Sequence, residues 1–385
     1  MKKILCGVLS LILCVTAFLS MAVSASAAET VDLHLNATSA VLMEAETGTV
    51  LYQQNPNEQL PPASITKIMT LLLVMEALDA GKVRLSDIVT ASERAASMGG
   101  SQIYLKVGEQ MTVEDLLKSV VIASANDAAA ALAEHLCGSI ETFVEKMNTR
   151  AVELGMKDTH FENTNGLDDT TTNHYTSAMD VAIMSRALIE HPLILTYSSI
   201  WMDSIRDGAF GLTNTNRLVR FYPGATGLKT GSTAKAKFCI SATAERDGMH
   251  LIAVIMGSPT RDIRNEEAKK LLDYGFANFA VYRDEAQDLG ELGVTGGLQD
   301  VCRVRTDGFS ALIEKGKAGE ISRKVNLPPQ LVAPIEKGQK IGTLAYYAGD
   351  KLLGECDIFA TESVHKISFI DIFFRMLKNC FGLTG

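Results

Sequence analysis

Basic residues are scarcer than acidic ones in this chain of 385 residues, and aromatic residues make up only 6% of it. Against 45 aspartates and glutamates there are 36 lysines and arginines, so the formal net charge is −9. A surface this acidic has no general attraction for nucleic acid, and we expect no nucleic-acid partner. Hydrophobic residues nevertheless account for 47% of the chain, which excludes a largely disordered protein. At roughly 150 residues per domain, the length predicts two or three domains.

Motifs for metal, nucleotide and lipase-type chemistry are also missing. The chain contains no His-Glu-x-x-His, no Gly-x-Ser-x-Gly, no P-loop and no Gly-x-Gly sequence. Its seven histidines are scattered, and its seven cysteines form no Cys-x-x-Cys pair. Neither a zinc site nor a disulfide framework is expected from this spacing. We therefore expect no metal and no cofactor.

The first 27 residues have the pattern of a signal peptide. Lys2 and Lys3 precede an almost unbroken apolar run over 4–23, and Ala25-Ser26-Ala27 supplies a small-residue cleavage site. An uncleaved transmembrane helix is the alternative, but the cleavage site follows the run so directly that export is favoured. The pattern predicts a mature chain that begins near Ala28 and works beyond the cytoplasmic membrane.

The order of predicted strands and helices divides the mature chain into two domains and a tail. Strand-like segments lie at both ends of residues 28–280 with helices between them, which predicts one α/β domain whose terminal strands pair. Over 281–365, short alternating segments between glycine and proline turns predict a small all-β domain. The expected strands of the first domain are 40–45, 49–53, 237–244 and 249–256, and its expected helices are 64–78, 113–122, 126–136, 140–154, 177–189 and 265–276.

Residues 366–385 have the pattern of an amphipathic helix. From 367 to 381 the polar residues fall within one sector of about 100°, and the other positions are apolar and rich in phenylalanine. Three charges in so short a segment argue against a spanning helix. We expect a helix in the membrane headgroup plane, with Arg375 and Lys378 toward anionic lipid. A helix docked on the β domain or on a second copy of the chain is the alternative.

Ser64-Ile65-Thr66-Lys67 places a hydroxyl and an amine on one face of a predicted helix. A serine is a good nucleophile at neutral pH only when a base takes its proton. Lysine can be that base if burial lowers its pKa, and the apolar sequence of this helix indicates burial. The pattern alone is weak, because an ordinary helix start explains it and two more Ser-x-x-Lys sequences occur in the chain.

Two further motifs strengthen this interpretation. Ser124-Ala125-Asn126 stands at the start of an alanine-rich predicted helix, where capping alone would explain it. Lys229-Thr230-Gly231 leads into the second pair of predicted strands, where a solvated turn is the alternative. In this order, Ser-x-x-Lys, Ser-x-Asn and Lys-Thr-Gly are the three active-site motifs of penicillin-recognising serine acyltransferases.

The sequences around these motifs resemble the low-molecular-mass penicillin-binding proteins that are serine D-alanyl-D-alanine carboxypeptidases. The resemblance runs from about Val41 to the C-terminus. It implies an α/β domain of the penicillin-recognising transpeptidase and β-lactamase type, followed by a small β domain, in agreement with the pattern above. The segments that carry it are 61–70 (PPASITKIMT), 165–168 (NGLD), 174–180 (HYTSAMD), 227–233 (GLKTGST), 333–335 (API) and 338–342 (GQKIG).

The resemblance implies a catalytic role for four residues. Ser64 would attack the carbonyl between two D-alanines and form an acyl-enzyme, and neutral Lys67 would take its proton. Ser124 would relay a proton toward the departing amine. Asn126 would orient Lys67 and the substrate amide.

It also implies how the substrate is held. Lys229 and Thr230 would bind the terminal carboxylate, and Gly231 would leave room for the substrate backbone. The backbone N–H groups of Ser64 and Ser232 would form the oxyanion hole.

The family places one arginine after the strand pair to bind the substrate carboxylate. Alignment favours Arg264 over Arg261, and a surface salt bridge is the alternative for Arg264. The basic residues around this strand pair would steer a peptide carboxylate toward it.

The resemblance implies as partners peptidoglycan stem peptides ending in D-Ala-D-Ala, β-lactam antibiotics and the outer face of the membrane. A β-lactamase, a DD-endopeptidase or transpeptidase, and a non-catalytic cell-wall binding protein are the alternatives. The Glu-x-x-Leu-Asn sequence of class A β-lactamases is absent. Intact motif residues argue against a non-catalytic protein.

Overall fold

The computed structural model describes residues 31–380, without the side chains of 378–380. The predicted signal peptide, its cleavage site and the last five residues of the predicted tail lie outside this range. The boundaries at 280 and 365 stay predictions, whereas the fold class is confirmed: an α/β domain is followed along the chain by an all-β domain.

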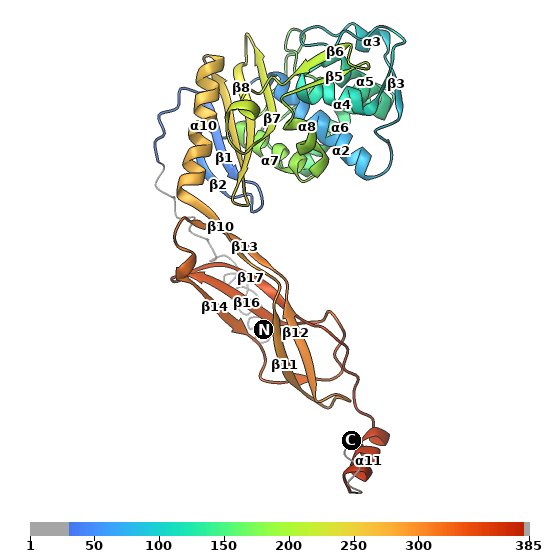
Figure 1. Cartoon of the computed structure of the whole chain (residues 1–385), viewed down its shortest axis with the longest axis vertical. Coiled ribbons are helices and arrows are strands. Elements are labelled where there is room, and N and C mark those ends of the chain that lie inside the picture. Colours follow the sequence, from blue (N-terminus) through green and yellow to red (C-terminus); the bar gives the residue numbers. More distant parts are fainter. Residues whose placement is uncertain (1–30, 381–385) are drawn as a thin grey trace, which may run out of the picture. The chain divides into compact units, whose positions relative to one another are not determined.

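Five antiparallel strands form the central sheet of the α/β domain (Figure 1), in the order β2-β1-β9-β8-β7. The first strand pairs with the last, with Leu42 opposite Ala253, so the predicted pairing of the terminal strands is confirmed. The strands are β1 (Ser39–Glu44), β2 (Val50–Gln54), β7 (Ala225–Thr233), β8 (Lys237–Arg246) and β9 (Met249–Ser258).

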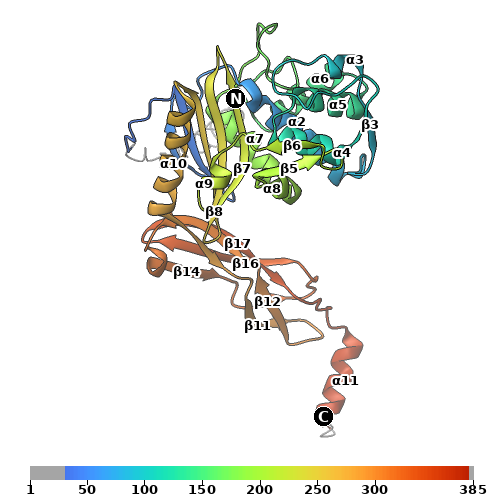
Figure 2. The same cartoon turned by 45° about the horizontal axis from the view of Figure 1, so that its top comes forward.

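Helices cover both faces of this sheet. Helix α10 (Arg261–Asn278) lies on one face, and α7 (Ala178–Ile189) lies on the other, next to the remaining helices (Figures 1 and 2). Four of the predicted helices begin with a serine or threonine whose side chain accepts a backbone N–H three residues on, which satisfies a donor that the helix itself leaves open. The other helices of this domain are α2 (Lys67–Asp79), α3 (Glu93–Ala96), α4 (Val113–Ile122), α5 (Asn126–Cys137), α6 (Ile140–Glu153), α8 (Pro192–Ser198) and α9 (Leu218–Phe221).

Helix α2 is the buried centre of the helical layer. It contacts α4, α5, α6 and α7, and its apolar residues point in every direction, as the sequence predicts. The structure corrects its start, because residues Ala63–Thr66 form a separate 3₁₀ turn (η1) and the α-helix begins at Lys67. Two short hairpins were not predicted, β3 (Ile88–Thr90) with β4 (Gln110–Thr112) and β5 (Met202–Ile205) with β6 (Phe210–Thr213).

The C-terminal region is built from strands, as predicted. A six-stranded sheet has the order β14-β16-β17-β12-β11-β15, and a separate pair joins β10 to β13. Tyr346 is buried in its core and stacks on Phe309 with ring centroids 3.9 Å apart. The elements are β10 (Phe279–Asp284), β11 (Asp288–Thr295), β12 (Val301–Thr306), β13 (Phe309–Glu314), η2 (Ala318–Glu320), β14 (Ile321–Asn326), β15 (Leu331–Val332), β16 (Lys340–Ala348), β17 (Lys351–Ala360) and the helix α11 (Phe369–Cys380).

Candidate active site

The turn η1 and the first residue of α2 bring Ser64 and Lys67 together. Lys67 Nζ lies 2.9 Å from Ser64 Oγ and donates to the carbonyl oxygen of Asn165 at 2.8 Å. Lys67 is completely buried, whereas Ser64 is partly exposed. The hydroxyl can therefore meet a substrate from solvent while its neighbouring amine is shielded from water.

The surroundings of Lys67 favour its neutral form. Burial, and then the positive charge of Lys229, hold the pKa of the Lys67 amine well below its usual range, while the Asp127 carboxylate opposes them. A neutral amine beside a hydroxyl can accept its proton, so the geometry and the pKa direction both suit a base.

Ser124 and Lys229 form a second hydrogen-bonded pair. Lys229 Nζ donates to Ser124 Oγ and to the carbonyl oxygen of Thr230, both at 2.9 Å. Ser124 has a φ of +63°, in the left-handed region that non-glycine residues rarely occupy. Such a conformation costs about 1–3 kcal/mol and is typical of functional sites. Lys229 is 1% exposed, and burial followed by the charge of Arg264 lowers the pKa of its amine to about 7.

Asn126 is held by its neighbours but keeps one acceptor open. Its side-chain N–H donates to the carbonyl oxygen of Gly99 at 2.6 Å, and its backbone N–H donates to that of Ser101 at 2.7 Å. Its Oδ1 is buried and has no hydrogen-bond partner within the described part of the chain. A buried acceptor without a partner is unfavourable unless a ligand supplies the donor.

Lys229, Thr230 and Gly231 lie inside the edge strand β7, so the solvated-turn alternative is wrong. Thr230 Oγ1 donates to Thr215 Oγ1 at 2.8 Å. A Cβ on Gly231 would lie 2.9 Å from the backbone nitrogen of Ser64 and 3.0 Å from that of Ile65. The turn η1 therefore requires a residue without a Cβ at Gly231, and the expected room for a substrate backbone beside this glycine stays a prediction. Ser232, the next residue, is exposed.

Arg264 is buried near Lys229, not exposed in a surface salt bridge. It is 3% exposed, and its guanidinium donates to Asn265 Oδ1 at 2.8 Å and to the Cys239 carbonyl oxygen at 3.4 Å. No carboxylate among the described residues forms an ion pair with it. Burial, followed by the charge of Arg261, lowers the pKa of Arg264 to about 10. Lys229 and Arg264 are thus two buried cations without a carboxylate partner among the described residues, and this part of the site is suited to bind an anionic group.

Several residues that contribute to the site were not singled out from the sequence. Asp127 is 1% exposed and accepts N–H groups from Ile103, Leu105 and Ala128. Asn165 offers its carbonyl oxygen to Lys67 from 98 residues away. The sequence offered one signal for each of these residues. Asp127 directly follows the Ser-x-Asn motif, and Asn165 is the first residue of the NGLD segment.

Asp168, the last residue of the NGLD segment, lies against the end of the active-site strand β7 and the turn that follows it. Thr233 Oγ1 donates to the Asp168 carboxylate at 2.5 Å, and Lys235 Nζ donates to the Asp168 carbonyl oxygen at 2.8 Å. Within residues 31–380, no three side chains of metal-ligating type come together to hold a metal ion.

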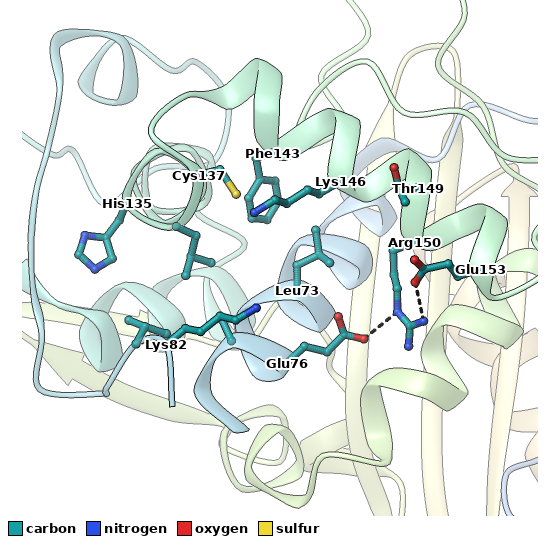
Figure 3. Close-up of a pocket in the computed structure, with 13 residues that line it drawn as sticks. Leu73, Glu76, Lys82, His135, Cys137, Phe143, Lys146, Thr149, Arg150 and Glu153 are labelled. Carbon is teal, nitrogen blue, oxygen red and sulfur yellow. Dashed lines mark hydrogen bonds and ion pairs between the residues drawn. The ribbon is translucent and has the colours of Figure 1, made fainter. Parts of the chain in front are cut away.

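A separate cavity of about 360 Å³ opens between α2, α5 and α6 (Figure 3). Arg150 neutralises Glu76 and Glu153 at its edge, while Leu73 and Phe143 are among its apolar lining. None of the residues predicted for catalysis or substrate binding lines this cavity.

Comparison with known proteins places both domains. Residues 22–260 match the family Peptidase S11, D-alanyl-D-alanine carboxypeptidase, and residues 286–366 match the penicillin-binding protein 5 C-terminal domain. The D-alanyl-D-alanine carboxypeptidase DacF of Bacillus subtilis (strain 168) is 42% identical over 384 residues, which cover 98% of each chain.

Solved structures agree with this match. Penicillin-binding protein 5 from Haemophilus influenzae superposes with a TM-score of 0.76 at 34% identity, covering 88% of this chain and 100% of the other. Penicillin-binding protein D2 from Listeria monocytogenes, in its ampicillin-bound form, has a TM-score of 0.59 at 32% identity and covers 64% and 100%. The chain therefore belongs to the S11 peptidase family, the D-alanyl-D-alanine carboxypeptidases, and carries in addition the C-terminal domain of penicillin-binding protein 5.

Proposed function

We propose that this chain is an exported serine carboxypeptidase that removes the terminal D-alanine from peptidoglycan stem peptides through an acyl-enzyme on Ser64. One observation carries the proposal, namely the contact of 2.9 Å between Ser64 Oγ and a completely buried Lys67 amine. A serine and a desolvated lysine at this distance form an activated nucleophile without a metal or a histidine.

The reaction would use the two pairs in turn. Lys67 takes the proton of Ser64 as Ser64 Oγ bonds to the carbonyl carbon, and the backbone N–H groups of Ser64 and Ser232 stabilise the oxyanion. Ser124 then relays the proton that Lys67 has taken to the departing amine of D-alanine, so that the peptide C–N bond breaks, Lys67 is neutral again and the acyl-enzyme remains. The open Oδ1 of Asn126 accepts the amide N–H of the substrate. Water finally attacks the acyl carbonyl while Lys67 takes its proton and passes it to Ser64 Oγ, which frees Ser64 and releases the shortened peptide.

The two buried cations, Lys229 and Arg264, would hold the substrate carboxylate. Both side chains are almost completely buried, and the hydroxyl of Thr230, on the same strand as Lys229, donates to Thr215 Oγ1. A carboxylate entering this site compensates charges that the fold leaves unpaired, so binding selects peptides that end in a free carboxyl group.

This arrangement predicts a pH dependence of substrate affinity. Because the pKa of Lys229 is lowered to about 7, the amine of the free enzyme loses its proton as the pH rises above 7. We expect the KM for a D-Ala-D-Ala peptide to rise above pH 7, by up to about tenfold per pH unit. Lys229→Arg should have a higher KM at pH 7 but a flat profile up to pH 9, since arginine stays protonated. Parallel profiles for the two proteins would contradict the assignment.

The same nucleophile would react with β-lactams. The crystal structure of the Listeria relative contains ampicillin, and a β-lactam offers Ser64 a carbonyl whose leaving group stays attached to the acyl fragment. We propose a long-lived acyl-enzyme with penicillin.

Release of free D-alanine from a pentapeptide ending in D-Ala-D-Ala tests the proposed activity. We expect stoichiometric D-alanine and a tetrapeptide product. Turnover of penicillin without D-alanine release would indicate a β-lactamase, cleavage of cross-linked stems alone would indicate an endopeptidase, and binding without either product would indicate a non-catalytic protein.

We also propose that the C-terminal helix attaches the exported enzyme to the membrane surface. Among the described side chains of α11, most of the apolar ones are exposed to solvent, with Phe369 82% and Phe374 59% exposed. None of the helices in the described range is long and apolar enough to cross a membrane. Arg375, which the sequence places toward anionic lipid, forms an ion pair with Asp300 at 3.0 Å within the chain, and the side chain of Lys378 lies outside the described residues. The exposed phenylalanines carry the proposal.

A chain ending at Ile367 tests this attachment. This end point keeps the buried Val364 and the hydrogen bond from Ile367 N–H to the Gly296 carbonyl oxygen, so the β domain stays intact. We expect the full chain to sediment with anionic vesicles and the shortened chain to stay in the supernatant with unchanged kcat/KM on a small peptide. Phe373→Glu should also prevent sedimentation, whereas Ser368→Ala should not. If the full chain does not sediment, α11 is a packing element.

A further inference from the structure

The residue before the proposed nucleophile has a strained backbone. Ala63 has a φ of +48°, in the left-handed region that alanine rarely occupies. A residue in this conformation persists only where its surroundings hold it in place. The Ala63 carbonyl belongs to the peptide group that joins Ala63 to Ser64. A contact that holds this carbonyl therefore also fixes the orientation of the Ser64 backbone.

The Ala63 carbonyl is held from two sides. Thr66 Oγ1 donates to it at 2.9 Å, across the turn η1. Gly166 packs against it so closely that a Cβ there would lie 1.7 Å from the Ala63 oxygen. Thr66 is completely buried, and its hydroxyl also lies 2.8 Å from Nε2 of His174, which is 8% exposed.

The hydrogen bonds define the tautomer of His174. The backbone N–H of Glu162 points at Nδ1 at 2.9 Å, so Nδ1 must be the acceptor and carry no proton. The ring proton is therefore on Nε2 and is donated to Thr66 Oγ1. Thr66 has one hydroxyl proton, which it gives to Ala63. A single neutral tautomer thus satisfies every donor and acceptor in the chain from Glu162 to Ala63.

The charge state agrees with this assignment. Burial lowers the pKa of His174 to about 4, although the carboxylates of Glu162 and Asp168 oppose the shift and His160 supports it. In a protonated ring, Nδ1–H would point at the Glu162 N–H, and two donors cannot form the hydrogen bond of 2.9 Å that is observed between them.

We propose that His174 is a positioning residue that, through Thr66, locks the strained Ala63 carbonyl and so holds Ser64 Oγ in line with Lys67. The inference rests on the proposed role of Ser64 as the nucleophile. His174 takes no part in proton transfer to the substrate, and its effect is on the rate of acylation and not on binding. Misplacement of a reacting group by about 1 Å commonly costs roughly 10²-fold in rate.

Two amide variants of His174 test the roles of its two ring nitrogens separately. In His174→Gln, the amide N–H reaches the position of Nε2 and can still donate to Thr66. In His174→Asn, the amide oxygen takes the place of Nδ1 and accepts from Glu162, but Thr66 loses its donor. We expect His174→Asn to lower the first-order acylation rate at saturating penicillin by roughly 10- to 100-fold, with little change in half-saturation. His174→Gln should retain most of the rate.

Variants of Thr66 give a second, independent measurement. Thr66→Val removes the hydroxyl at nearly constant shape and should reproduce the acylation defect of His174→Asn, whereas Thr66→Ser should restore the rate. Combining Thr66→Val with His174→Asn should cost little more than either change alone, because both break one chain of hydrogen bonds. Rates are normalised to the folded fraction from the thermal transition.

The outcomes separate this inference from the proposed function. If the wild-type protein is acylated on Ser64 but folded His174→Asn and Thr66→Val react at the wild-type rate, the positioning role is wrong and the proposed function stands. Equal losses in His174→Asn and His174→Gln, tracking thermal stability, would likewise overturn it as mere packing. If the wild-type protein is not acylated, the proposed function itself fails.

Discussion

Lys67→Arg should be almost inactive in acylation, with the rate lowered by about 10²–10⁴-fold. Arginine keeps its proton at any pH at which the protein folds, so it cannot take the proton of Ser64. Among the described residues, no carboxylate forms an ion pair with Lys67, whose hydrogen bonds go to Ser64 Oγ and the Asn165 carbonyl oxygen. Stopped-flow acylation with a chromogenic cephalosporin measures the effect.

Lys229→Arg is the matched control for Lys67→Arg. It makes the same chemical change at the second buried lysine, which we assign to charge and not to proton abstraction. Its acylation rate at saturation should fall far less than that of Lys67→Arg, with the loss mainly in KM. If the two variants lost the same amount in the first-order rate, the division of labour between the two lysines would be wrong.

Ser64→Ala should abolish both D-alanine release and penicillin acylation. Removing the nucleophile from a coupled nucleophile and base commonly costs roughly 10⁶-fold in rate. The fold should survive, because Ser64 is partly exposed and the substitution removes one hydrogen bond, the one from Lys67 Nζ to Ser64 Oγ. A thermal midpoint close to that of the wild-type protein, measured beside the activity, separates loss of chemistry from loss of structure. Residual turnover near the wild-type rate would assign the nucleophile elsewhere.

The sequence identified the three motifs because each is contiguous and stands at the start or edge of a predictable element. The apolar run of α2, the alanine-rich α5 and the Asp-Gly hairpin between β8 and β9 follow periodic patterns that survive without tertiary information. The pairing of β1 with β9 followed from the order of these elements.

Positions fixed by backbone conformation or by long-range contacts were not predictable in this way. The sequence of the turn η1 predicts a continuous helix with α2. The positive φ of Ala63 and the packing of Gly166 against the Ala63 carbonyl make η1 a separate turn. The strand β7 is rich in glycine and threonine, a composition that also suits a turn, and only pairing with β8 makes it a strand. His174 reaches Thr66 across 108 residues, so its role depends wholly on the fold.

The alternative for Arg264 was resolved by burial, whereas attachment of the tail to a membrane stays a proposal. A pattern of charges could not show that Arg264 is enclosed beside Lys229, because its neighbours come from β8 and from α10 itself. In the tail, the amphipathic period predicted the helix α11 correctly. It could not show that Arg375 pairs with Asp300, which lies in the loop between β11 and β12.

Peptide mapping by mass spectrometry of the penicillin-treated protein tests whether Ser64 is the nucleophile. We expect one mole of penicilloyl adduct per mole of folded protein, on the peptide that contains Ser64, and no adduct in Ser64→Ala. An adduct on a peptide without Ser64, or none on folded wild-type protein, would contradict it.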